Sequence, residues 1–226
     1  MKVELIDYMG NDNSVVTAAR VSFARSAHDY TQEQNAKLIK YLATHNHFTT
    51  FTHCFVSLAM TAPIAIKAQC DKHVVGFTSN TESRRYIKTT PELFVPTFRH
   101  APTGNVKQGS GEVISEITSK ASISGEVVLV TETQDTLQRE YEEICQSCID
   151  HYEYLICLGV APEQARLVLP QGVETNWVWT GSLYAWARFY NLRTDPHAQK
   201  EIQDLAKRVG EIIEPLYPVS WQALTR

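Results

Sequence analysis

The stretch "FTTFTHCFVSLAMTAPIAIKAQCDKHV", residues 48–74, predicts a strand that runs directly into a helix. Its first thirteen residues, 48–60, alternate as a half-buried strand does. One face of that strand would carry Phe51, His53, Phe55 and Ser57. Proline suits the first turn of a helix, so Pro63 predicts that residues 63–74 are helical.

Upstream of this stretch, two helices and one strand are expected. Residues 2–9, "KVELIDYM", alternate well enough to predict an edge strand, and residues 14–24 predict a short apolar helix. Residues 31–46 predict a longer helix, because Thr31 can cap it and Gln34 occupies the capping-box position.

Downstream, the pattern alternates between helices and strands. We expect short strands over 84–90 and 93–99, a helix over roughly 131–158, a helical turn from Pro162, a strand over 172–181, a helix capped by Ser182 and a last long helix from Pro196. Residues 101–124 are rich in Gly, Ser, Thr and Lys, and predict a surface excursion that is partly helical. The whole predicts the α/β (α+β) class: a single domain, residues 1–226, with a mixed, largely antiparallel sheet flanked by helices.

Composition excludes several classes of function. The formal net charge is −4 and the pI is near 6.1, so we expect no nucleic-acid partner, and any anion site must be local. The N-terminus carries Glu4 and Asp7 within its apolar pattern, which does not suit a signal peptide. The most apolar run, residues 55–70, is shorter than the ~20 residues of a membrane helix, so we expect no membrane partner.

The cysteines predict reduced thiols in the cytoplasm, because the chain has five of them and no export signal. Cys145, Cys148 and His151 have a CxxCxxH spacing, but no second Cys/His pair follows at zinc-site spacing. We therefore expect no metal site. Instead, we expect a helix whose apolar stripe is formed by Ile144, Cys148, Tyr152 and Leu155.

The polar stretch "DKHVVGFTSNTESRRY", residues 71–86, begins where the helix over 63–74 should end. Lys72 and His73 would lie in the last turn of that helix, where positive charge is favoured. On a strand, Ser83 and Arg85 would share a face and form a clamp for a phosphate. The alternative is a solvated turn with salt bridges to Asp71 and Glu82.

Further candidate groups lie outside this stretch. His45, His47 and His53 have no carboxylate among them, which favours structural histidines over a metal site. Arg166 lies in the otherwise apolar "ARLVLP" and needs a carboxylate or an anionic ligand. Arg193 ends a predicted helix near Asp195. It is either a C-terminal cap with a local ion pair or a cation aimed at a ligand that gains negative charge.

Taken together, six motifs resemble those of the flavin-dependent thymidylate synthases. In order they are "ARVSF", "HNHFTTFTH", "APIAIKAQCDKH", "SNTESRRY", "GVAPEQARLVLP" and "NLRTDPHAQKEI". The resemblance runs from about residue 18 to the end of the chain and leaves residues 101–124 unaccounted for. It implies a mixed α/β fold and a homotetramer with active sites shared between chains. It also implies bound FAD, NADPH as reductant, and 5,10-methylenetetrahydrofolate as the donor of a one-carbon unit to dUMP, giving dTMP.

The resemblance also implies roles for individual residues. Arg193 would be catalytic, meeting the uracil ring and favouring ionisation at N3, so that C5 becomes more nucleophilic. The dUMP site would include Gln69, Lys72, Thr81, Glu82, Ser83, Arg84, Arg85, Arg166 and Arg193. The FAD site would include Thr49, Lys72, His73, Val74, Asn80, Thr81, Ser182, Tyr184, Arg188 and His197.

This sequence departs from the family signature in its first half. Lys72, His73 and Val74 stand where the family has Arg-His-Arg, and Thr81 stands in place of Glu. Valine offers no hydrogen-bond donor, so Arg84 or Arg188 would have to compensate, or flavin would bind more weakly. Two alternatives therefore stay open: a related dUMP hydroxymethylase, and a flavin- or nucleotide-binding subunit without catalysis.

Overall fold

The computed structural model describes residues 1–87, 89–104 and 108–225. The chain forms two compact units. The first comprises Met1–Ala62, Ile66–Thr81 and Thr175–Arg226, and the second comprises Pro63–Ala65 and Glu82–Glu174. Both units combine helices with antiparallel strand pairs, which confirms the α/β (α+β) class and the largely antiparallel pairing expected from the sequence.

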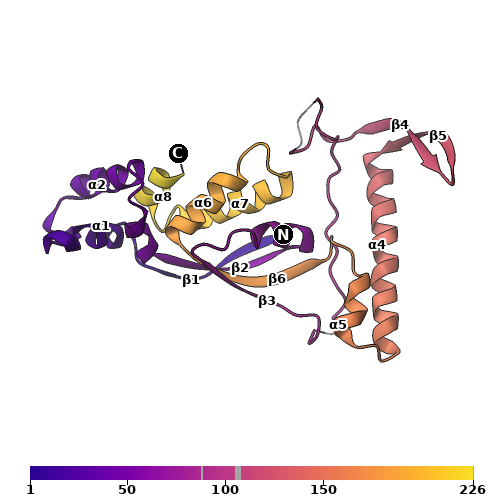
Figure 1. Ribbon diagram of the computed structural model, residues 1–226, viewed down its shortest axis with the longest axis horizontal. Helices are drawn as coiled ribbons and strands as arrows, with labels where there is room; N and C mark the ends of the chain where they lie inside the picture. Colours follow the sequence, from indigo (N-terminus) through magenta and orange to yellow (C-terminus); the bar gives the residue numbers. More distant parts are fainter. Residues whose placement is uncertain (88, 105–107, 226) are drawn as a thin grey trace. The chain divides into compact units, whose positions relative to one another are not determined.

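Within the described residues, the first unit is built on a four-stranded sheet of order β1-β2-β6-β3 (Figure 1). The strands are β1 (Lys2–Met9), β2 (Phe55–Pro63), β6 (Glu174–Ser182) and β3 (Phe77–Thr81). β1 pairs antiparallel with β2, and β3 pairs antiparallel with β6. β1 is therefore an edge strand, as its sequence predicts, whereas β3, at the other edge, is not among the expected strands.

Of the helices of the first unit, α6 and α7 lie on one face of this sheet (Figure 1), and α2 packs against α1 and α8. The helices are α1 (Asp12–Arg20), α2 (Gln32–Thr44), α3 (Ile64–Cys70), α6 (Leu183–Arg193), α7 (Lys200–Ile213) and α8 (Pro218–Leu224). The predicted capping box of α2 is confirmed: the Thr31 hydroxyl accepts from Gln34 N–H, and the Gln34 side chain accepts from Thr31 N–H.

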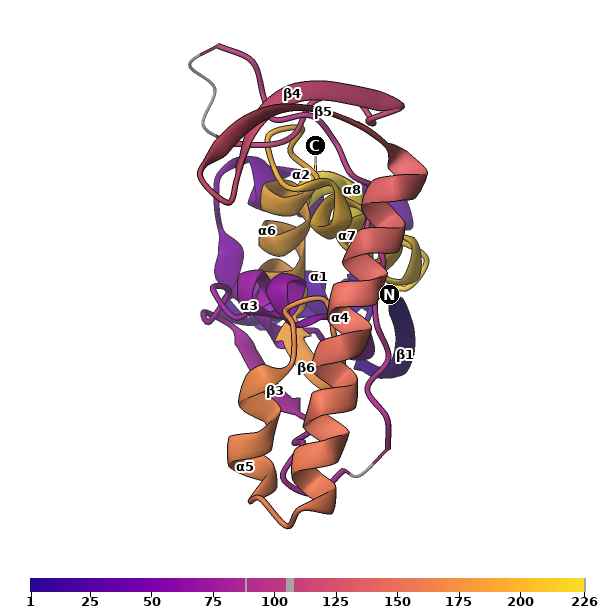
Figure 2. The same ribbon diagram turned by 90° about the vertical axis from the view of Figure 1, so that its right-hand side faces the viewer.

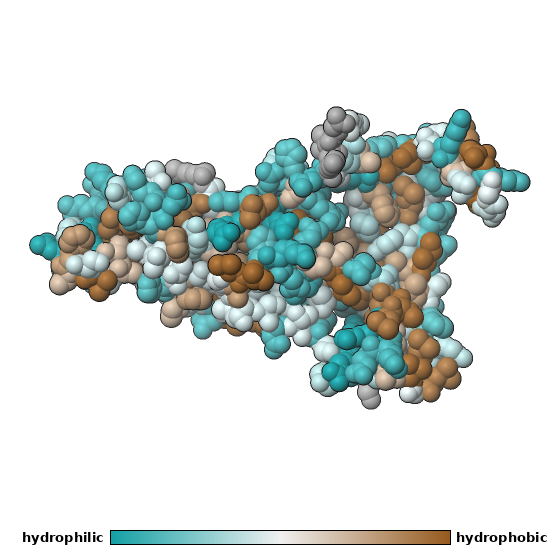
Figure 3. Space-filling model, viewed as in Figure 1, coloured by the Kyte–Doolittle hydropathy of each residue, from teal (hydrophilic) through white to brown (hydrophobic). Residues whose placement is uncertain are grey.

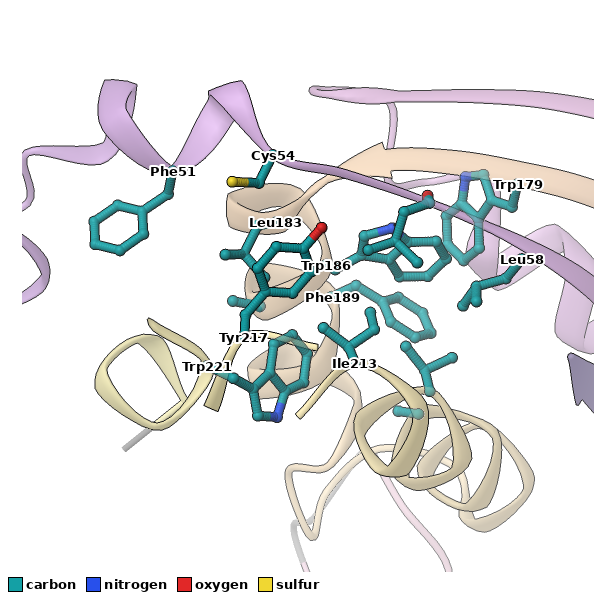
Figure 4. Close-up of a cluster of buried hydrophobic side chains, with 14 of the residues drawn as sticks. Phe51, Cys54, Leu58, Trp179, Leu183, Trp186, Phe189, Ile213, Tyr217 and Trp221 are labelled. Carbon is teal, nitrogen blue, oxygen red and sulfur yellow. The ribbon is translucent and has the colours of Figure 1, made fainter. Parts of the chain in front are cut away.

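The core of the first unit is an aromatic cluster between α6 and the sheet (Figure 4). Trp186 is fully buried, and its indole Nε1–H donates to the carbonyl oxygen of Val56 on β2 at 3.1 Å. Trp179 on β6 meets Trp186 edge to face, with ring centroids 4.9 Å apart. Burial together with this indole bond fixes α6 against the sheet.

The described part of the second unit contains a β-hairpin and two helices (Figure 2). Strands β4 (Glu116–Ile123) and β5 (Glu126–Thr133) pair antiparallel, and β5 leads into α4 (Gln134–Cys157). α4 packs against α5 (Pro162–Ala165) and the 3-10 turn Arg166–Val168. Large apolar side chains are exposed on this unit (Figure 3), among them Ile144, Tyr154, Leu158 and Leu167.

Several expected elements are wrong. Residues 48–53 form a 3-10 helix, and the strand begins only at Phe55. Residues 84–90 and 93–99 do not form the expected strands: a turn covers 84–86, and Leu93 and Arg99 make only isolated bridges; Lys88 lies outside the described residues. In the described residues of these two stretches, the apolar alternation does not become a strand, because pairing is limited to the bridges of Leu93 with Val173 and of Arg99 with Val113.

The excursion over 101–124 contains a strand rather than a helix in its described part; residues 105–107 lie outside that part. Its β-branched residues pair across the hairpin with β5, an interaction that composition does not reveal. The stripe predicted on α4 is right at Tyr152, which is buried, and wrong at Ile144, which is 67% exposed. Cys148 and Leu155 are only partly buried, and the other buried residues of the helix are Cys145 and Ile149.

Two helix boundaries differ in ways that affect the candidate site. The helix expected over 63–74 ends at Cys70, so Lys72 and His73 lie in the turn that follows it. The last long helix begins at Lys200 rather than at Pro196, which leaves His197 in the connecting segment.

The position of Gly181 generates a first prediction. A Cβ at Gly181 would collide with the ring of Phe77, which stacks on Trp179 with centroids 4.4 Å apart. We expect Gly181→Ala to lower the free energy of unfolding by about 1–3 kcal/mol, measured by urea denaturation. In a Phe77→Leu background the same change should cost less, because the obstructing ring is gone. Strictly additive losses would contradict this explanation.

Candidate active site

The centre of the candidate site is the guanidinium of Arg193, at the end of α6. Its Nε donates to His73 Nε2 at 2.9 Å, and its Nη2 donates to the carbonyl oxygen of Gln69 at 3.1 Å. Gln69 lies in the last turn of α3, and its side-chain Nε2 donates to Gln199 Oε1 at 2.7 Å. The structure thus brings Arg193 next to Gln69 and His73, which lie about 120 residues earlier in the sequence.

His73 must be neutral to accept this hydrogen bond, because the arginine Nε always carries its proton. Burial, together with the positive charges of Arg193 and Arg188, lowers the pKa of His73 to about 4. The ring packs edge to face against Phe189 and Trp179, with centroids 5.1 and 6.5 Å away. His73 is therefore both held in place and kept uncharged.

A cavity of about 260 Å³ opens beside these groups. Its walls include Lys72, His73, Val74, Phe77, Arg188 and Arg193. Three of these side chains carry a positive charge and the histidine is neutral, so the cavity suits an anionic or electron-rich ligand. Val74 is 70% exposed and adds an apolar wall at the position where the family resemblance implied an arginine.

A larger cavity of about 590 Å³ shares one wall residue, Arg188, with the first. Phe48 and Tyr184 also line it, and their rings stack with centroids 5.4 Å apart. Lys40 adds a second cation to its wall. An apolar aromatic surface next to cations suits a ligand with a flat ring and a charged tail. A third cavity, of about 550 Å³, is lined in part by His53 and His28.

The other residues of the first unit that the resemblance assigns to the FAD site are more dispersed. Thr49 is exposed in the 3-10 helix, and Asn80 and Thr81 are exposed on edge strand β3. Ser182 is buried, and its hydroxyl accepts from Ala185 N–H as the N-cap of α6, as the sequence predicts. The backbone N–H of His197 donates to Asp195 Oδ1 at 2.8 Å, and its ring Nδ1 lies 2.9 Å from the same oxygen; these contacts hold the pKa of Asp195 below its ordinary value.

Residues 82–85, which are candidates for binding the phosphate of dUMP, belong to the second unit. Ser83 Oγ accepts from Arg85 N–H at 3.3 Å, so the two residues form a local turn rather than a strand. The Arg85 Nε lies 3.0 Å from Glu163 Oε2, with both side chains about half exposed. Arg84 donates to the carbonyl oxygen of Thr89, and the side chain of Glu82 is partly buried.

Two expectations about charge pairing are corrected by these contacts. Arg85 pairs with Glu163, and Asp71, the partner suggested by the solvated-turn alternative, pairs with Lys67 instead. Arg166 is exposed beside Leu167, which is 80% exposed, so it needs no buried partner. The reason is that "ARLVLP" folds as a short 3-10 turn with its apolar residues only partly covered.

Sequence reasoning missed Phe77, Leu192 and Gln199 as neighbours of the site. Nothing in the local sequence marks any of these three as a site residue, so only the tertiary structure places them there. In the part of the chain that the structure describes, no group of three or more His, Cys, Asp or Glu side chains is arranged to hold a metal ion. Among the same residues, no helix is long and apolar enough to cross a membrane.

Comparison with known proteins places this geometry in a family. The chain is 32% identical over 221 residues to a flavin-dependent thymidylate synthase of Kosmotoga olearia, covering 98% of this chain and 88% of the relative. It is 33% identical over 224 residues to the enzyme of the same name from Thermotoga neapolitana, covering 99% of this chain and 90% of the relative.

Solved structures agree with the sequence relatives. A UMP/dUMP methylase, PolB from Streptomyces cacaoi, bound with 5-Br dUMP, has a TM-score of 0.75 and 28% identity, covering 99% of this chain and 94% of that one. The same methylase bound with 5-Br UMP has a TM-score of 0.80 and 27% identity, covering 99% and 93%. A family model described as "Thymidylate synthase complementing protein" matches residues 4–219. The chain therefore belongs to the thymidylate synthase complementing protein family.

Proposed function

We propose that this protein is a flavin-dependent thymidylate synthase that converts dUMP into dTMP, with 5,10-methylenetetrahydrofolate as one-carbon donor and NADPH as reductant. The observation that carries the proposal is the guanidinium of Arg193, oriented by His73 and Gln69 at the wall of a cationic cavity. A fixed cation at this place would stabilise negative charge on the uracil ring, which makes C5 more nucleophilic.

FAD fits the donors of the first unit. The proposed FAD residues that line the two cavities supply cations at Lys72 and Arg188, an aromatic surface at Tyr184, and the neutral ring of His73. When bound, FAD supplies the redox chemistry of the methyl transfer. Thr49, Val74, Asn80, Thr81, Ser182 and His197 complete the proposed set, although the Ser182 hydroxyl already caps α6.

For dUMP, the proposal divides the ligand between two groups of residues. Gln69, Lys72 and Arg193 would hold the base. The residues from Thr81 to Arg85, together with Arg166, would hold the phosphate. The turn of Ser83 and Arg85 supports this second role, because a phosphate could replace Glu163 as the partner of the half-exposed guanidinium.

The proposal extends to assembly and location. We infer a homotetramer with active sites shared between chains, working in the cytoplasm without nucleic-acid or membrane partners. Exposed large apolar side chains support subunit contacts; they include Val74, Val75, Tyr86 and Leu167.

A turnover assay tests the function directly. Purified protein supplied with FAD, NADPH, methylenetetrahydrofolate and dUMP should be yellow, oxidise NADPH and form dTMP, identified by mass spectrometry. A hydroxymethyl-dUMP product would establish the hydroxymethylase instead. Flavin binding without turnover would support a non-catalytic subunit, and colourless, inactive protein would refute the proposal. UMP should be tested in parallel, because the similar methylase was solved with analogues of both nucleotides.

A second prediction concerns Arg188, which lines both cavities near the uncharged Val74. Removing a charged hydrogen-bonding group costs about 1.5–3 kcal/mol, so Arg188→Ala should weaken FAD binding by ~10–100-fold in a flavin fluorescence titration. Adding Val74→Arg to that variant should restore part of the affinity, since it returns a cation to the same cavity. Arg139→Ala, on the exposed face of α4, is the matched control. Unchanged FAD affinity in Arg188→Ala would rule out this role.

A third prediction concerns the phosphate. Arg85→Ala should raise the KM for dUMP by ~10–100-fold and leave FAD affinity within a factor of two, because one charge-assisted contact to phosphate is lost. Glu163→Gln is the control, since it removes the competing carboxylate but leaves the guanidinium. Its KM for dUMP should stay level or fall. A higher KM in both variants would mean that the ion pair serves only to fold the turn.

A further inference from the structure

We propose that His73 is a positioning residue for Arg193: its Nε2 lone pair accepts the Arg193 Nε–H and thereby sets the direction of the guanidinium. This inference rests on the proposed function, because it concerns how the ring-facing arginine is held. It departs from a role in which His73 acts only as a direct ligand of the flavin.

The hydrogen bond itself allows one form of the histidine. An arginine Nε has one proton and can only donate, so a ring nitrogen 2.9 Å away must present a lone pair. His73 must therefore carry its single proton on Nδ1. A second proton on Nε2 would remove the acceptor and set an imidazolium against a guanidinium.

Two anchors fix the plane of the guanidinium. Nε is bound to the His73 ring, and Nη2 is bound to the main-chain oxygen of Gln69, four residues earlier. Both anchors come from the end of α3 and its following turn, whereas Arg193 comes from α6. Among the described residues, no side-chain hydrogen bond involves Nη1, so this group remains available to a ligand in the cavity.

The His73 ring is itself packed against two neighbouring aromatic rings. Phe189, from α6, and Trp179, from β6, meet it edge to face, with centroids 5.1 and 6.5 Å away. Ring, guanidinium and backbone therefore form a rigid unit before any ligand arrives. An arginine already ordered in this way loses less side-chain entropy when it engages a ligand.

Burial and the positive charges around the His73 ring keep its Nε2 unprotonated, so that it can accept the hydrogen bond over the working range of pH. Arg188 and Arg193 face it from α6, Lys72 precedes it in the same turn, and Trp179 on β6 carries no charge. Burial and the two arginines together lower the pKa of His73 to about 4. The ring thus accepts the hydrogen bond from about pH 5 upward.

The first test uses the intact, ligand-free protein. In 15N-histidine NMR, the His73 signal, assigned by its absence in His73→Gln, should show an Nδ1–H tautomer with an unprotonated Nε2. It should not titrate above about pH 5. An Nε2–H tautomer, or a midpoint near 6.5, would overturn the proposal. No turnover is needed, so this result stands apart from the proposed function.

The second test compares two variants. His73→Gln puts an amide oxygen close to the place of Nε2, whereas His73→Leu removes the acceptor. We expect the Arg193 Nε–H resonance to keep its hydrogen-bonded shift and slow exchange in His73→Gln, and to lose both in His73→Leu. The value of kcat for dTMP formation should fall at least 100-fold in His73→Leu and no more than 10-fold in His73→Gln.

The outcomes of this comparison separate the alternatives. Equal loss in both variants, with an unchanged Arg193 resonance, would overturn the positioning role and leave His73 as a flavin contact. The predicted NMR signature in a protein that forms no dTMP would uphold the arrangement and refute the proposed function instead.

Discussion

The junction between β6 and α6 is the constraint on which the candidate site depends. The strand runs directly into the helix, the Ser182 hydroxyl caps the first turn, and Leu183 N–H donates to the carbonyl oxygen of Cys54 at 2.8 Å. Trp186 then ties α6 to β2 through its indole. Because one face of α6 is locked into the core in this way, Arg188 and Arg193 have little freedom in where they lie.

The same constraint explains how a chain of net charge −4 forms a strongly cationic cavity. Two arginines come from one helix, a lysine comes from the turn after α3, and the partly buried His73 stays neutral. Positive charges held this close repel one another, and a partly buried site screens that repulsion less than water does. An anionic ligand would relieve the repulsion, which links the cost of folding the site to its capacity to bind.

The departure from the family signature also has a structural counterpart. Val74 and Arg188 line the same cavity, although one lies in a turn and the other on α6. A cation lost at residue 74 can thus be supplied by another residue of the same lining without a change in the fold. Neither the spacing of the motif nor the identity of residue 74 reveals this, because the two positions are 114 residues apart in the sequence.

The sequence by itself determined the fold class, the capped starts of α2 and α6, the edge strand β1 and the family motifs, because these depend on local periodicity and capping. It misassigned residues 48–53 and the described residues of 84–90, 93–99 and 101–124, where strand formation depends on which partner is present. Only the tertiary structure decided that His73 accepts a hydrogen bond from Arg193 and that Arg85 pairs with Glu163. Those contacts join residues far apart in the chain, and the packing of α6 on the sheet, rather than any local pattern, brings His73 and Arg193 within hydrogen-bonding distance.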